Sequence, residues 1–119
     1  MTAAETLRAA TAAGEAFQRP LNAFIDEFRR ASGARRESLV RDPIDGCGPL
    51  QGLVAATVSA LCREVGLAAP EWVGRVRSDE PFFAFPARGF ALRVRLMIES
   101  PPAFRARNVF VPENFMSRA

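Results

Sequence analysis

The stretch PLQGLVAATVSALCREVGL, residues 49–67, carries the strongest helical pattern of this chain. Its apolar and small side chains recur every three or four residues, which is the period of an α-helix with one buried face. They are Leu50, Leu53, Val54, Thr57, Val58, Leu61, Cys62 and Val65. Pro49 suits the first turn of a helix, and Gly66 suits the position that ends one. The stretch therefore predicts a core helix against which the rest of the chain packs.

On the N-terminal side, two helices are predicted within residues 2–32. Thr2 and Glu5 have the spacing of a capping box, so a first helix is expected to begin there and to end before Pro20. In PLNAFIDEFRRAS, residues 20–32, apolar side chains form one helical face, and Gly33 is expected to end that second helix. The apolar positions are Leu21, Phe24, Ile25 and Phe28.

A short third helix is predicted around residues 35–40. The segment DPIDGCGP, residues 42–49, is an internal linker rich in turn-forming residues. The three glycines at 46, 48 and 52 miss the dinucleotide-binding spacing and follow no strand, so they indicate the start of a helix rather than a phosphate cradle.

The C-terminal half is aromatic and rich in proline. An ordered loop is predicted over 68–90, with Trp72, Phe82, Phe83 and Phe85 packed inward. FALRVRLMI, residues 90–98, fits both a helix and an alternating strand. A single strand has no partner in its own chain, so a helix is favoured, and a short strand that pairs with another subunit is the alternative.

The last twenty residues, 100–119, form a basic and aromatic C-terminal element. Ser100 is predicted to cap a short helix over 101–108, and Pro112 to begin another over 112–119. Taken together, the chain predicts one small, mainly α-helical domain over 1–119, a bundle of four to six helices with an aromatic-rich loop.

The composition excludes several kinds of chemistry. The chain has no histidine, and all 16 of its basic residues are arginines, with a net charge of +3. Without histidine the commonest general base and metal ligand are missing, and two isolated cysteines cannot form a zinc site. We expect no catalytic residue, no metal and no cofactor, a buried Cys62, and a reduced cytoplasmic protein without an export signal or membrane segment.

Two function classes besides protein binding stay open. Arg93, Arg95, Arg105 and Arg107 would suit the phosphates of a nucleic acid, as in an accessory or regulatory protein. An acidic loop made of Glu71, Asp79 and Glu80 would suit a small enzyme. No helix-turn-helix that reads the major groove is visible, because the break at 18–20 is too abrupt.

Three stretches carry a family resemblance: RPLNAFIDEFRRA (19–31), LVAATVSALCREVGLAAPEWV (53–73) and LRVRLMIESPPAFRARNVFVPENFMSRA (92–119). Residues 17–119 resemble the region after the helix-turn-helix in actinobacterial Xre-like regulators, which are commonly encoded beside nucleotidyltransferase-like proteins and look like antitoxins. The DNA-binding domain of those regulators lies outside the region of resemblance, so DNA binding is not implied.

The resemblance implies a non-enzymatic, cytoplasmic, antitoxin-like protein that binds and neutralises a nucleotidyltransferase-type toxin. Guanidinium groups suit the carboxylates of such a site, and phenylalanines supply buried area. The expected partner-binding residues are Arg93, Arg95, Phe104, Arg105, Arg107, Asn108, Phe110 and Phe115. The competing interpretation is that the tail folds back on its own core, and a homo-oligomer is left open.

Overall fold

Six α-helices dominate the computed structural model, which describes residues 1–84 and 89–117. The helices are α1 (Ala3–Ala13), α2 (Gln18–Arg30), α3 (Gly33–Val40), α4 (Pro49–Glu64), α5 (Phe90–Glu99) and α6 (Pro102–Arg105). Two 3₁₀ helices, η1 (Gly14–Ala16) and η2 (Glu71–Gly74), and two short strands, β1 (Phe82–Phe83) and β2 (Val109–Phe110), complete the described elements. The predicted class, a small and mainly α-helical domain, is confirmed.

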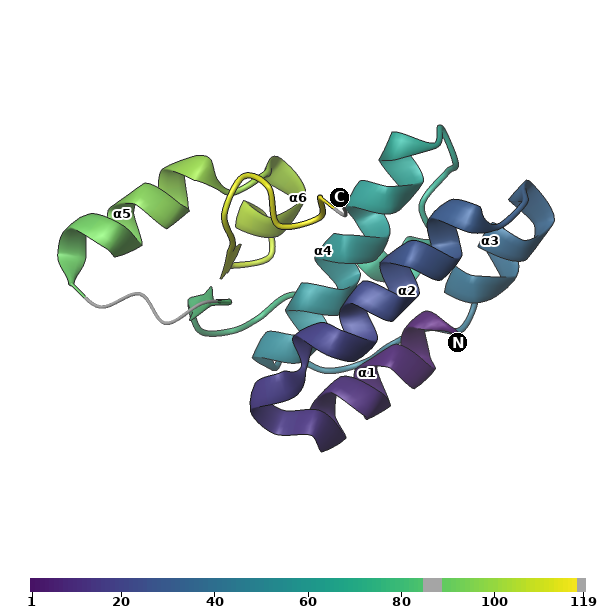
Figure 1. The fold of residues 1–119 in the computed structure, drawn as a ribbon, viewed down its shortest axis with the longest axis horizontal. Coiled ribbons are helices and arrows are strands. Elements are labelled where there is room, and N and C mark those ends of the chain that lie inside the picture. Colours follow the sequence, from purple (N-terminus) through teal and green to yellow (C-terminus); the bar gives the residue numbers. More distant parts are fainter. Residues whose placement is uncertain (85–88, 118–119) are drawn as a thin grey trace.

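Helix α4 is the centre of the fold, as residues 49–67 predict. Every residue from Gly52 to Val58 is buried, and α1, α2, α6 and β2 all pack against this helix (Figure 1). At its C-terminal end Gly66 has a φ of +71°, and the Leu67 N–H donates to the Cys62 carbonyl at 2.8 Å. This left-handed glycine and the bond across it form the expected helix stop.

The first two helices follow the predicted pattern, apart from the residue at which each of them ends. The Thr2 hydroxyl accepts from the Glu5 N–H at 3.2 Å, so the capping box is confirmed, and the four apolar positions of α2 are buried. The first helix ends earlier than expected, at Ala13, because Gly14 adopts a φ of +59°. The 3₁₀ helix η1 then carries the chain into α2.

The expectation that Gly33 ends α2 is wrong, because this glycine is the first residue of α3. Helix α2 ends at Arg30, where the Arg36 side chain donates to the carbonyls of Phe28 (3.0 Å) and Arg29 (2.9 Å). The Arg36 guanidinium thus donates hydrogen bonds to the last carbonyls of the helix. In a helix that ends on glycine, backbone N–H groups donate to these carbonyls instead.

The short-strand alternative for residues 90–98 is also wrong, because this segment forms α5. The two described strands lie elsewhere and pair in parallel, with Phe82 opposite Val109 and Phe83 opposite Phe110. Phe85 of the predicted aromatic loop lies outside the described residues. Trp72 is buried as expected, and its indole N–H donates to the Val40 carbonyl at 2.9 Å.

The C-terminal element departs from its predicted helices. Ser100 does not cap α6: its hydroxyl donates to the Leu96 carbonyl, and it accepts from the Val111 N–H at 2.8 Å. It thereby ties the end of α5 to the chain after β2. Residues 112–117 form turns instead of the start of a helix, with the Phe115 N–H bonded to the Pro112 carbonyl at 3.0 Å.

Candidate functional site

The most unusual surface of the described chain is an exposed apolar stripe on α5. Figure 1 shows α5 reaching away from the helices α1–α4, and the molecule is correspondingly elongated, 43 × 26 × 26 Å. Leu96 is the one buried side chain of this helix. It packs with Phe83 and Phe110 in a small cluster separate from the main core.

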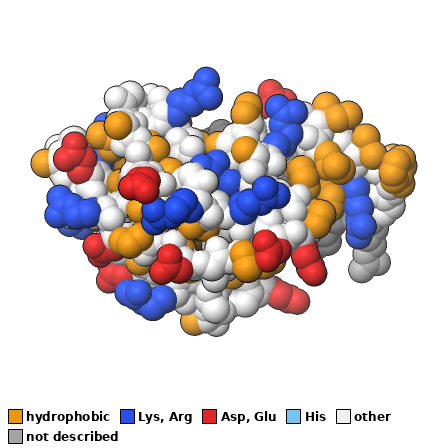
Figure 2. All heavy atoms as spheres, turned by 180° about the vertical axis from the view of Figure 1, so that it is seen from behind, with side chains coloured by type: hydrophobic (Ala, Val, Ile, Leu, Met, Phe, Trp, Pro, Cys, Tyr) orange, Lys and Arg blue, Asp and Glu red, His pale blue; other side chains and the backbone are white. Residues whose placement is uncertain are grey.

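The stripe is made by four side chains of α5: the exposed Phe90, Met97 and Ile98 and the half-buried Val94. Their spacing of i, i+4, i+7 and i+8 places them together, on the side of the helix away from Leu96. Phe90 is 83% exposed and Ile98 is 70% exposed. Figure 2 shows hydrophobic side chains gathered at the end of the molecule that α5 forms. A soluble domain rarely leaves such large apolar side chains side by side in water, so this stripe is a candidate contact surface.

Two arginines flank the stripe, one on each side of the helix. The Arg95 guanidinium bonds the Glu99 carboxylate at 2.9 Å, and this interaction raises the pKa of Arg95. The Arg93 guanidinium lies 5.5 Å from the centre of the Phe83 ring, a cation–π geometry. Both arginine side chains are exposed, so the surface that α5 presents is apolar at its centre, with Arg93 at one edge and the Arg95–Glu99 ion pair at the other.

The structure divides the predicted partner-binding residues into two groups. Phe104, Phe110 and Phe115 are buried, and the Phe104 and Phe115 rings contact each other at a centroid distance of 5.6 Å. These phenylalanines are therefore at most 7% exposed in this fold and pack inside it. Arg105 is exposed like Arg93 and Arg95, so these three arginines lie on the surface of the fold.

Arg107 and Asn108 hold the tail in place. The Arg107 side chain donates to the Val73 carbonyl at 2.8 and 3.1 Å and to the Ala103 carbonyl at 2.8 Å. Burial lowers the pKa of this guanidinium. Asn108 has a φ of +63° and donates to the Ser78 carbonyl at 3.3 Å. Both side chains therefore serve the fold rather than an exposed contact.

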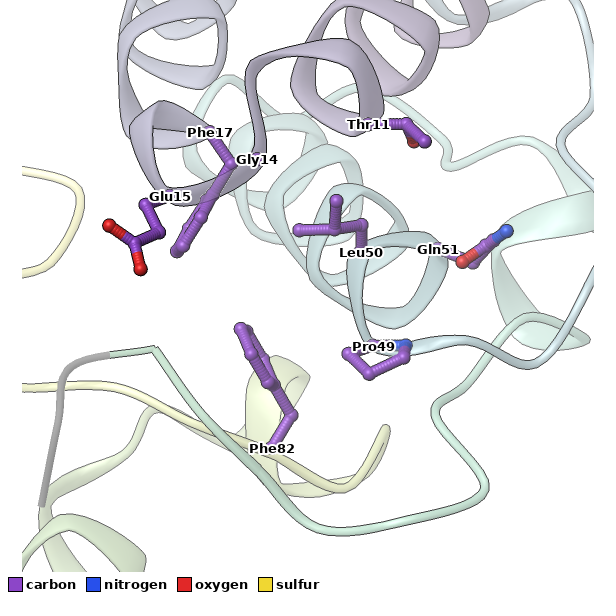
Figure 3. A pocket seen from close by; sticks show the side chains of 8 residues that line it. All are labelled: Thr11, Gly14, Glu15, Phe17, Pro49, Leu50, Gln51 and Phe82. Atoms are coloured by element: carbon purple, nitrogen blue, oxygen red, sulfur yellow. The ribbon is translucent and has the colours of Figure 1, made fainter.

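An apolar groove of about 440 Å³ lies where α1, η1, Phe17, α4 and β1 meet. Figure 3 shows the Phe17 and Phe82 side chains reaching toward each other across it, with Pro49 and Leu50 of α4 forming another wall. The Phe17 and Phe82 ring centroids are 6.0 Å apart. The exposed Glu15 carboxylate lies beside Phe17 at the edge of the groove. A neighbouring hollow shares these two rings and Glu15 and continues along β1 to Ala84.

The acidic loop residues do not gather into a site. Glu71 is exposed and bonds Arg75 at 2.9 Å, while Asp79 lies beside the Cys47 thiol and raises the pKa of that thiol. A reactive cysteine needs a lowered pKa, so Asp79 works against a nucleophilic role for Cys47. Cys62 is buried as expected, and burial raises its pKa. Within the described ranges, no group of acidic, cysteine or histidine side chains is arranged to hold a metal ion.

The sequence predicts only part of the stripe on α5 and none of the apolar groove. The helical spacing of Val94, Met97 and Ile98 is visible in the sequence, but only the structure shows that this side faces solvent. The groove is assembled from residues 11–17, 49–51 and 82. No local pattern joins three segments that far apart in the chain.

Comparisons of the chain with protein-family models, with curated proteins and with solved structures found no match. Among the residues that the structure describes, no helix has the length and apolar character needed to cross a membrane.

Proposed function

We propose that this protein is a non-enzymatic binding module that recognises a protein partner through the stripe on α5. The observation that supports this most is the exposure of Phe90 and Ile98 on a helix that buries only Leu96. An amphipathic helix that lays its apolar face in a groove of another protein uses this i, i+4, i+7 pattern of anchors. Large apolar anchors supply most of the binding energy of such contacts.

The resemblance to the Xre-like regulators supports a nucleotidyltransferase-type toxin as that partner. The arginines at the edges of the stripe suit a surface rich in carboxylates, and Arg105 adds a third exposed guanidinium in the same half of the chain. The protein would act as an antitoxin by covering the partner's carboxylate-lined site. The buried phenylalanines of the tail would contribute by supporting the region from which α5 extends.

The experiment is co-expression with a nucleotidyltransferase-type protein encoded beside the gene of this chain. We expect a stable complex and relief of the partner's toxicity. Ile98→Ser should weaken the complex at least tenfold, because it removes an exposed anchor without disturbing the core. Leu92→Ser is the matched control: Leu92 is also partly exposed on α5 but lies off the stripe.

Three outcomes would contradict the proposal. A gene neighbourhood without such a protein removes the basis for the named partner, and equal effects of the two serine variants remove the stripe as the contact. The third is binding to nucleic acid that falls steeply and linearly with the logarithm of salt concentration, which would indicate phosphate contacts instead. A contact anchored by apolar side chains should change little with salt.

A further inference from the structure

The molecule carries two surfaces that match each other in chemistry. One is the stripe on α5, which spans eight residue steps, about 12 Å of helix. The other is the groove between Phe17, Leu50 and Phe82, which continues along β1. The stripe faces away from its own body, so it does not reach the groove of the same copy. Each surface is therefore left open within one molecule of this fold.

The charged residues at the edges of the stripe and of the groove are complementary in sign. The stripe has Arg93 at one edge and the Arg95–Glu99 ion pair at the other, and the groove has the Glu15 carboxylate at its edge. Placing a stripe in a groove brings unlike charges together, which favours the contact. Placing two stripes face to face would instead bring the arginines of two copies together, which is unfavourable. The occupant that the groove fits best is thus an apolar helix edged by arginine.

We propose that two copies of this chain associate, with the α5 stripe of one copy lying in the groove of the other. The same pair of surfaces can form twice in a closed dimer, because each copy supplies one stripe and one groove. A ten-residue helix buries a small area, below that of a permanent dimer, so the association is weak and depends on concentration.

Self-association would also regulate partner binding by the stripe on α5. A stripe that lies in the groove of a second copy is covered, so the second copy and the protein partner compete for it. This competition rests on the proposed function, whereas the self-association does not.

The test measures mass in solution by sedimentation, using the full chain alone from micromolar to near-millimolar concentration. We expect the average mass of the wild type to rise above that of a monomer. Ile98→Asp, which disables the stripe, and Glu15→Arg, which reverses the charge of the groove, should each be monomeric over the same range. Both positions are exposed, so neither change disturbs the core.

The decisive measurement mixes the two variants. The Ile98→Asp copy keeps its groove and the Glu15→Arg copy keeps its stripe, so the mixture can form one intact contact. We expect a 1:1 complex that neither variant forms alone. A wild type that stays monomeric overturns the proposal, as does a Glu15→Arg variant that associates like the wild type. Neither result bears on the partner complex, which is measured separately with the co-expressed protein.

Discussion

Arg105 and Arg107 lie two positions apart in the tail, but the fold uses them differently. Arg105 is exposed, whereas the Arg107 guanidinium is half-buried against the carbonyls of Val73 and Ala103. Sequence alone treats them alike, because both follow an alanine or phenylalanine in a basic segment. The difference comes from the turn after α6, which places Arg107 over the η2 segment. Spatial neighbours that are 34 positions away cannot be read from the local pattern.

Replacing Arg107 with Gln should therefore destabilise the fold. The change removes a donor fork from two carbonyl groups and leaves them without their partner, which costs about 1–3 kcal/mol. Arg105→Gln is the matched control and should change the free energy of unfolding by less than about 0.5 kcal/mol. Urea unfolding of the two variants measures both values. Equal losses would show that the bonds to Val73 and Ala103 contribute nothing to stability.

Glu27 gives the fold a dependence on pH. Its carboxylate accepts from the Met1 amino group at 2.7 Å and from Arg35 at 3.0 Å. The bond to the amino group is the main cause that lowers the pKa of Glu27 from its ordinary value of 4.5, and the bond to Arg35 adds to it. A lowered pKa in the folded state means that the unfolded chain binds the proton more readily. The stabilisation is complete above pH 4.5 and is lost as the pH falls through the lowered pKa.

The variant Glu27→Gln should consequently flatten the loss of stability on acidification. Thermal melts between neutral pH and pH 3 measure this, and the wild type and the variant should converge at the acid end. Glu37→Gln, at an exposed position on α3, is the control for the loss of one negative charge. A variant whose melting temperature falls in parallel with the wild type over the whole range would contradict the assignment.

At the scale of the elements, periodicity predicted the helices that lie in one continuous stretch of sequence. Helix α2 presents one buried face whose residues recur at helical spacing, so its type and its face are both readable. The type of α4 is readable in the same way, but this helix is buried on all sides from Gly52 to Val58. The segment of α5 was ambiguous because apolar residues occupy both of its sides. Its exposed side looks like a core face in the sequence, and only the position of α5 on the body shows that it faces solvent.

Gly52 sets the distance between α4 and the chain that follows η2. A Cβ at this buried position would lie 2.7 Å from the Ser78 amide nitrogen and 3.2 Å from Val109. Gly52→Ala should therefore cost about 1–3 kcal/mol through overpacking, although alanine is the better helix former. Gly33→Ala is the matched control, because a Cβ there meets nothing within 4 Å. It should be neutral or stabilising by up to about 1 kcal/mol.

Denaturant unfolding of the two alanine variants checks this prediction. A stable Gly52→Ala variant would mean that the Ser78 segment moves away from α4 without loss. A glycine at position 52 would then need a reason other than this close packing.

At the scale of the whole molecule, the C-terminal half contains two kinds of apolar residue that composition does not separate. Phe104, Val109, Val111 and Phe115 are packed against the main core, whereas Phe90 and Ile98 are exposed on α5. The sequence predicts that this half is apolar and basic. It does not assign each residue to the core or to the surface, because that depends on how Ser100 and Arg107 fix the tail onto α4 and η2.

Deleting residues 100–119 should thus unfold the protein. The deletion removes five buried apolar side chains, four of them in the main core, and truncating even one phenylalanine of a core costs about 3–5 kcal/mol. A domain of this size has a total stability of about 5–15 kcal/mol, so the summed loss exceeds what the fold can tolerate. Circular dichroism and a thermal melt of the shortened chain measure the result.

The contrasting variant replaces both Phe90 and Ile98 with Ser in the full chain. Because these side chains are exposed, its melting temperature should stay close to that of the wild type, while both partner binding and self-association are lost. A shortened chain that melts cooperatively near the wild-type temperature would instead show that the tail is an appendage and that its phenylalanines are free to meet a partner.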